Sequence, residues 1–141
     1  MQRVSLVVSV LVLAGAALGI FGEGPISRRH LAVDGARIEF EQFQRQYRAA
    51  TIRIELSENS PADFAIELSG SICARSEFVS VSPRPVRQET RANGMRLVFA
   101  STSEAAGRLV LLRMKPEAAG ALSGTLTVAG HSVPIGVFVW P

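Results

Sequence analysis

An uncharged apolar run near the amino terminus constrains this chain more than any other feature. From Val4 to Phe21 the sequence reads VSLVVSVLVLAGAALGIF, eighteen residues without a charge. As an α-helix this run would rise about 27 Å, slightly less than the hydrocarbon core of about 30 Å that a spanning helix must cross. The run therefore predicts one membrane helix within residues 1–21.

A cleaved signal peptide is the alternative interpretation of the same run. Arg3 would supply its charged start, Val4 to Leu13 its apolar centre, and Ala14 to Ala16 its small-residue cleavage site. We favour a retained anchor because the run continues to Phe21, beyond that site. In both cases the rest of the chain is exported. We therefore expect an inner-membrane protein with its carboxyl-terminal domain on the extracytoplasmic side, or a periplasmic protein if the run is cleaved.

The remainder of the chain has the pattern of β-strands. Gly22 to Pro25 interrupts the helical run, so we expect a short juxtamembrane linker over 22–30 and a domain over 31–141. In that domain apolar and polar residues alternate, which is typical of strands with one buried face. The expected strands surround 38–40, 52–56, 64–68, 78–81, 95–100, 108–114, 125–129 and 133–140. About eight short strands favour an all-β antiparallel immunoglobulin-like sandwich, with a small β-barrel as the alternative.

Local signals add turns and two short helices to this outline. Asn93-Gly94 predicts a two-residue hairpin with positive φ at both positions, and Pro83-Arg84-Pro85 predicts a bend. The segment Glu41–Ala50 places Phe43 and Tyr47 four residues apart, which favours a short helix, and Ser71–Ser76 has room for one helical turn.

The carboxyl-terminal strand, 133–140, is the most apolar run of the domain. Val137 and Val139 alternate with Phe138 and Trp140, so both faces of this strand are apolar. We expect both faces to be covered, by a central position in the sandwich or, as the alternative, by a partner protein.

Composition argues against several classes of function. Fifteen Lys and Arg against twelve Asp and Glu give a net charge of only +3, so we expect no nucleic-acid partner. No Gly-x-Ser-x-Gly elbow is present. His30, Cys73, Met114 and His131 match the residue types of a blue-copper site, but no histidine lies near Cys73 in the sequence. We therefore expect no catalytic residues, no cofactor and no metal, and we interpret Cys73 as a small buried apolar residue.

Two further groups of residues have ordinary structural explanations. Glu39, Glu41, Glu55 and Glu67 fall on the polar faces of predicted strands, which is typical of a soluble surface rather than of a glycosidase pair. A second group, which consists of Phe40, Phe43 and Tyr47, is expected in the core rather than on a stacking platform.

Three short motifs resemble a group of small bacterial membrane-anchored proteins that is functionally uncharacterised. The motifs are Gly24-Pro25-Ile26-Ser27-Arg28, Ile38 to Phe43, and the ending Val137 to Pro141. The resemblance implies one amino-terminal membrane helix, an exported domain and a role beside larger multi-pass membrane proteins, and it implies no catalytic residues.

The sequence thus predicts a non-catalytic, membrane-anchored accessory or interaction module of the bacterial cell envelope. Its expected partners are the membrane and another membrane or envelope protein. The alternative is a binding protein for a small or anionic envelope ligand such as a lipid headgroup. Arg28 and Arg29 follow the apolar run closely and are the candidate contacts with the membrane surface.

Overall fold

The computed structural model describes residues 2–17, 26–58, 60–61, 63–100 and 108–141. The amino-terminal helix is α1 (Gln2–Ala17), and a single helical turn, α2 (Ser71–Ala74), lies within the domain. The strands are β1 (Arg28–Val33), β2 (Ala36–Glu41), β3 (Phe43–Arg45), β4 (Ala50–Leu56), β5 (Phe64–Gly70), β6 (Ser76–Ser82), β7 (Arg87–Arg91), β8 (Gly94–Phe99), β9 (Leu109–Pro116), β10 (Gly120–Val128) and β11 (His131–Trp140).

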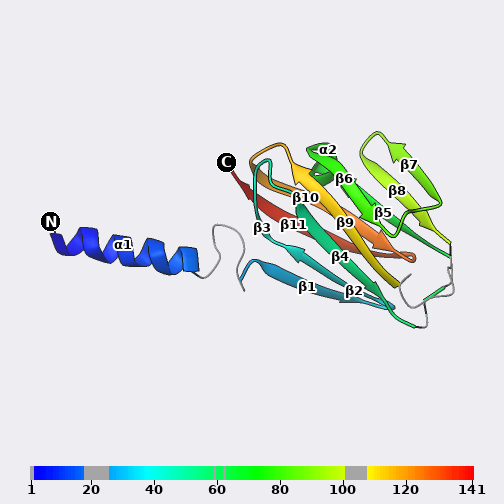
Figure 1. The fold of residues 1–141 in the computed structure, drawn as a ribbon, viewed down its shortest axis with the longest axis horizontal. Coiled ribbons are helices and arrows are strands. Elements are labelled where there is room, and N and C mark those ends of the chain that lie inside the picture. Colours follow the sequence, from blue (N-terminus) through cyan, green and yellow to red (C-terminus); the bar gives the residue numbers. More distant parts are fainter. Residues whose placement is uncertain (1, 18–25, 59, 62, 101–107) are drawn as a thin grey trace.

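The strands form two sheets that pack face to face (Figure 1). The five-stranded sheet has the order β1-β2-β4-β9-β6, and the six-stranded sheet has the order β3-β11-β10-β5-β8-β7. All pairs are antiparallel except β3 with β11, which run parallel. The all-β prediction is confirmed. The barrel alternative is wrong, because both sheets end in edge strands and do not close.

Alternation of side chains builds the core between the sheets. In β4 the side chains of Ile52, Ile54 and Leu56 are buried, whereas Thr51 and Arg53 on the opposite face are exposed. The same period of two continues through both sheets, because successive side chains of a strand point to opposite faces. The fully buried residues that fill the centre include Ile38, Ile54, Ile66, Leu68, Leu97, Val110, Leu112, Leu122, Leu126, Val128 and Val139.

The chain crosses from one sheet to the other at Gln42. This residue alone separates β2, in the five-stranded sheet, from β3, in the six-stranded sheet. The helix predicted over Glu41–Ala50 is therefore wrong. Backbone hydrogen bonds to β11 decide the local conformation, since the Phe138 amide donates to the Gln42 carbonyl at 2.7 Å and the Gln46 amide donates to the Trp140 carbonyl at 2.7 Å.

The sandwich begins earlier in the sequence than the alternation indicates. Strand β1 starts at Arg28, inside the segment 22–30 that the sequence assigns to a linker, and it pairs along its whole length with β2. Its pattern of burial is weak because it is an edge strand, with only Leu31 and Val33 partly buried against the core.

The structure confirms the Pro83-Arg84-Pro85 bend, which connects β6 and β7, and the helical turn after Ser71. It also confirms a hairpin between β7 and β8, but with turn residues Ala92 and Asn93, because Gly94 already pairs with Arg91. Among the described residues with positive φ, neither Asn93 nor Gly94 occurs. Gly94 instead meets a steric need, since a Cβ there would lie 2.5 Å from the Leu68 carbonyl oxygen.

Strand β11 lies between β10 and β3, so it is not an edge strand over its last three residues. Val137 and Val139 face the other sheet and are buried. The opposite face is only partly covered, because Phe138 is 37% exposed. The inner face is covered as predicted, whereas cover of the outer face by a partner stays a prediction.

Candidate interaction surfaces

Helix α1 presents apolar side chains to its surroundings on every side. Val4, Leu6, Leu11 and Leu13 are each at least 66% exposed, and the intervening valines are more than half exposed. A helix that is apolar all round has no polar face to turn toward water, so it requires an apolar environment. Within the residues that the structure describes, neither helix has both the length and the apolarity needed to cross a membrane.

A second apolar surface is the aromatic corner, which we define as Phe43, Phe138 and Trp140. Phe43 on β3 lies opposite Phe138 on β11, and the three side chains share the outer face of the six-stranded sheet. The rings of Phe138 and Trp140 meet edge to face, with centroids 4.8 Å apart and an interplanar angle of 70°. This geometry is favourable for an aromatic pair.

The aromatic corner lies where the chain joins the sandwich from its amino-terminal segment. Ser27 is fully buried, and its hydroxyl donates to the Phe43 carbonyl at 3.0 Å and accepts from the Phe43 amide at 3.2 Å. The Gln42 amide donates to the Ser27 carbonyl. These hydrogen bonds hold Gln42 and Phe43, at the crossing between the sheets, against Ser27, which directly precedes β1.

Tyr47 is a further exposed aromatic residue close to β3 in the sequence. It lies in the turn that follows β3, has a φ of 62° and is 67% exposed, with its amide bonded to the Pro116 carbonyl at 2.8 Å. Of the three aromatic residues expected in the core, only Phe40 is buried there. Phe43 is partly buried at the aromatic corner, because β3 belongs to the edge of the sheet rather than to a helix.

The two arginines predicted to contact a membrane surface lie on opposite faces of β1. Arg28 faces outward beside Glu41, its register partner on β2, and lines an open hollow of about 290 Å³. The Arg29 side chain reaches the crossing instead, where its Nε donates to Gln42 Oε1 at 2.6 Å. Both residues are exposed, but the strand does not bring their guanidinium groups together.

The outer faces of the two sheets differ sharply in character. On the five-stranded sheet, basic and acidic residues alternate across neighbouring strands, as in the register pairs His30 with Glu39 and Arg37 with Glu55. Arg53 and Glu55 form an ion pair of 2.8 Å, and Lys115 pairs with Glu77 on β6. The part of the six-stranded sheet near β11 instead carries small and neutral residues between the aromatic corner and β5: Ala121, Ser123, Thr125, Pro134, Gly136 and Ser69.

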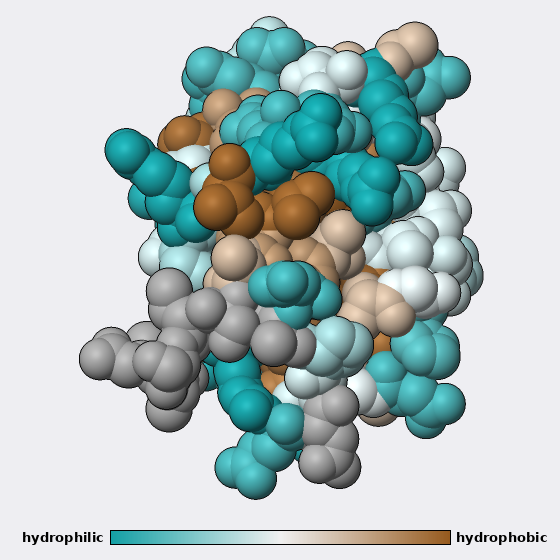
Figure 2. Space-filling model, turned by 90° about the vertical axis from the view of Figure 1, so that its right-hand side faces the viewer, coloured by the Kyte–Doolittle hydropathy of each residue, from teal (hydrophilic) through white to brown (hydrophobic). Residues whose placement is uncertain are grey.

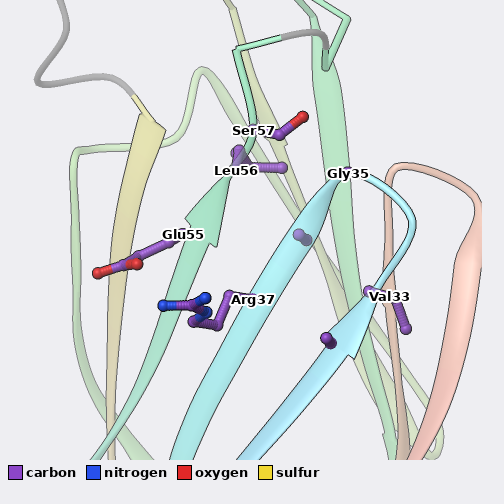
Figure 3. A pocket seen from close by; sticks show the side chains of 8 residues that line it. Val33, Gly35, Arg37, Glu55, Leu56 and Ser57 are labelled. Atoms are coloured by element: carbon purple, nitrogen blue, oxygen red, sulfur yellow. The ribbon is translucent and has the colours of Figure 1, made fainter.

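An open hollow of about 330 Å³ lies near the turn between β1 and β2. Figure 3 shows the side chains that line it. Val33 and Leu56 contribute apolar surface, while Arg37, Glu55 and Ser57 contribute one cation, one carboxylate and one hydroxyl. The cation and the carboxylate lie on neighbouring strands and offset each other's charge. Among these side chains the hollow therefore has no excess of either charge.

At the end of the sandwich with the β1–β2 and β10–β11 turns, apolar side chains gather near the centre, with hydrophilic ones above them (Figure 2). Val33 and Val133 at this end are partly buried and pack against the core. We interpret this apolar area as the exposed margin of the core.

The residues with potential metal-binding chemistry lie apart in the fold. His30 is on β1, Cys73 on α2, Met114 on β9 and His131 at the start of β11. Among the described residues, no group of three His, Cys, Asp or Glu side chains is placed to hold a metal ion. Cys73 is partly buried against the core, and burial raises the pKa of its thiol.

The four glutamates expected on polar strand faces, Glu39, Glu41, Glu55 and Glu67, are partly exposed. Glu67 forms an ion pair of 3.2 Å with Arg96 on the adjacent strand.

The alternation of Phe138 with Val139 is visible in the sequence, but the aromatic corner is not. Phe43 and Phe138 are nearly one hundred positions apart, so no local pattern connects them. Comparison with models of known families, with curated proteins and with solved structures yields no match to this chain.

Proposed function

We propose that this chain is a non-catalytic interaction module of the bacterial cell envelope, tethered to the membrane by its amino-terminal apolar run. The sandwich would lie on the extracytoplasmic side, close to the lipid surface, and would engage a larger membrane or envelope protein. The proposed tether is supported by the exposed apolar surface of α1 and by the continuation of the uncharged run to Phe21.

Burial of α1 in lipid is strongly favourable on physical grounds. Each exposed valine or leucine gains about 1.5–3 kcal/mol when it moves from water into an apolar environment. Eight such residues from Val4 to Leu13 are more than half exposed. Their combined transfer is far larger than the cost of placing the neutral serines of the run in lipid.

We also propose that the sandwich has immunoglobulin-like connectivity. The spatial order β2-β4-β9-β6 corresponds to strands A-B-E-D of that fold, and β5-β10-β11 corresponds to C-F-G. Strand β1 and the β7–β8 hairpin would then be additions at the edges. The short strand β3 follows β2 and pairs with β11. It would be the continuation of strand A in the second sheet.

Membrane fractionation and mass spectrometry test the tether. When the full chain is expressed in a bacterial host, we expect it to remain in the membrane after alkaline carbonate extraction, with an intact mass that includes Val4 to Phe21. A mature amino terminus at Ala17 would instead establish the signal-peptide interpretation. An active carboxyl-terminal alkaline phosphatase fusion would support the extracytoplasmic side, and an inactive one would contradict it.

Binding of a lipid headgroup or another small anionic ligand is the second candidate function. The exposure of Arg28 and Arg29 near the apolar run favours it. Affinity purification with the anchor intact separates the two candidates: a specific protein partner supports the interaction module. Absence of a partner, together with binding of the domain to anionic vesicles, supports the ligand-binding protein.

A further inference from the structure

We infer that the aromatic corner, with Tyr47 beside it, is a membrane-contact surface that seats the sandwich on the lipid headgroups. This inference rests on the proposed membrane tether and adds which part of the domain faces the bilayer. Its occupant is the interfacial layer of the same membrane that holds the apolar run.

The length of chain between the apolar run and the sandwich limits how far the corner can lie from the membrane. Six residues lead from Phe21 to Ser27, and a fully extended chain covers at most about 3.6 Å per residue, or roughly 22 Å here. Ser27 is bonded to Phe43, which is a member of the corner. The corner is therefore held beside the membrane end of the tether.

The short reach of the chain between Phe21 and Ser27 also excludes an upright sandwich with the β10–β11 turn on the membrane. Strand β11 has ten residues and spans roughly 30 Å, from His131 at one end of the sandwich to Trp140 at the other. Because this span exceeds the reach of the tether, the end with the Ala129–Gly130 turn cannot rest on the lipid with the strands upright. The end with Trp140 can.

The side chains at this end have the chemistry of a membrane interface. Tryptophan and tyrosine are enriched at the headgroup level, where an apolar ring and a polar group are both accommodated. Arg45, which is exposed and lies opposite Trp140 in register, adds a positive charge that anionic headgroups attract. The opposite edge of the sandwich, formed by β6 and β7, carries mainly polar and charged residues.

Trp140 is the single tryptophan of the chain and therefore reports directly on this contact. We would reconstitute the full chain at high lipid excess into phosphatidylcholine and phosphatidylglycerol vesicles. The lipids would carry a doxyl quencher at a shallow or a deep acyl position. The expected result is a blue-shifted Trp140 emission that loses more intensity with the shallow quencher than with the deep one.

A variant with the tryptophan moved elsewhere provides the matched control. The double substitution Trp140→Phe and Val86→Trp retains the tether and places the reporter before β7, where Val86 is 69% exposed. We expect no quenching by either lipid in this variant. Equal quenching in both proteins would overturn the inference, because it would show no preferred orientation.

Flotation of the same samples separates failure of the inference from failure of the proposed tether. If the chain floats with the vesicles but Trp140 is not quenched, the tether stands and the membrane contact is wrong. If Trp140 is shielded from acrylamide without lipid quenching, a protein, such as a second copy of this chain, covers the corner, and the inference is overturned. A chain that does not float overturns both proposals.

Discussion

The buried hydroxyl of Ser27 bridges the backbone of Phe43, sixteen residues away, by donating to its carbonyl at 3.0 Å and accepting from its amide at 3.2 Å. This pair of hydrogen bonds connects the start of β1 to β3, and hence the two sheets at their common edge. The side chain of one small residue thus satisfies two backbone groups at the crossing.

Substitution Ser27→Ala should destabilise the sandwich by about 1–3 kcal/mol, because it leaves the partly buried amide and carbonyl of Phe43 without their side-chain partner. Thermal unfolding of the full chain in detergent, followed by circular dichroism, measures the change. Ser80→Ala on β6, where the side chain is exposed, is the control and should have little effect. Equal melting temperatures for the two variants would contradict the structural role of Ser27.

Gly124→Ala should be strongly destabilising. A Cβ at this position would lie 2.1 Å from the Ser69 carbonyl oxygen and 2.6 Å from Ile72 Cγ2, so β5 or α2 would have to shift. Overpacking of this kind costs about 1–3 kcal/mol or more. Gly136→Ala is the matched control, because the nearest atom to its Cβ would be 4.0 Å away. Chemical denaturation of both variants decides the prediction, which fails if Gly136→Ala is the more harmful change.

On β11, a substitution of the buried Val139 should cost more stability than a conservative substitution of the partly exposed Phe138. Val139 is fully buried, so Val139→Ala should cost about 2 kcal/mol through lost burial and a cavity. Phe138→Leu keeps most of the apolar side chain at a position that is 37% exposed and loses mainly the ring contact with Trp140, which is worth about 1 kcal/mol. Denaturant midpoints of the two variants give the order, and the reverse order would show that the outer face of β11 is buried.

The Cys73 thiol should react slowly with iodoacetamide at pH 8. Burial raises its pKa, so a smaller fraction is thiolate than in a free cysteine at the same pH. The stability that this thiol contributes is present below its ordinary pKa and is lost as the pH rises through the raised value. The rate of alkylation as a function of pH should therefore have its midpoint above that of the urea-unfolded chain. Coincident midpoints would contradict this environment.

If the apolar run is the tether proposed above, Leu11→Arg should weaken its insertion and raise the fraction of the chain that is released from the membrane. A charge near the centre of a spanning segment costs about 2.5–3.5 kcal/mol of insertion free energy. Carbonate extraction measures the released fraction, and Leu11→Ala serves as the neutral control. Retention of the arginine variant would show that residue 11 does not lie in the hydrocarbon core.

Some of this molecule follows from local sequence patterns. The period-two alternation predicted strands around Ile38, Ile54 and Ile66, because a strand with one buried face requires that pattern wherever it lies in the sheet. The alternation of β11 and the helical turn after Ser71 are likewise visible in the local sequence.

Other features depend on residues that are distant in sequence. Phe43 and Tyr47 have a helical spacing, but long-range bonds of Gln42 and Gln46 with β11 place them on a strand and in a turn. Gly94 resembles a turn glycine, although its position is required by the backbone of β5. A single strand carries no information about which neighbour it will pair with, so such features are absent from local patterns.

The sequence alone determined that the chain has one uncharged apolar run and a set of half-buried strands, because both depend on the order of apolar residues along the chain. Only the tertiary structure decided that β3 joins β11 and that Phe43, Phe138 and Trp140 meet on one outer face. The physical reason is that the buried face of a strand follows from the alternation of its own residues. The residues that meet on an outer surface depend instead on which distant strands pair through hydrogen bonds.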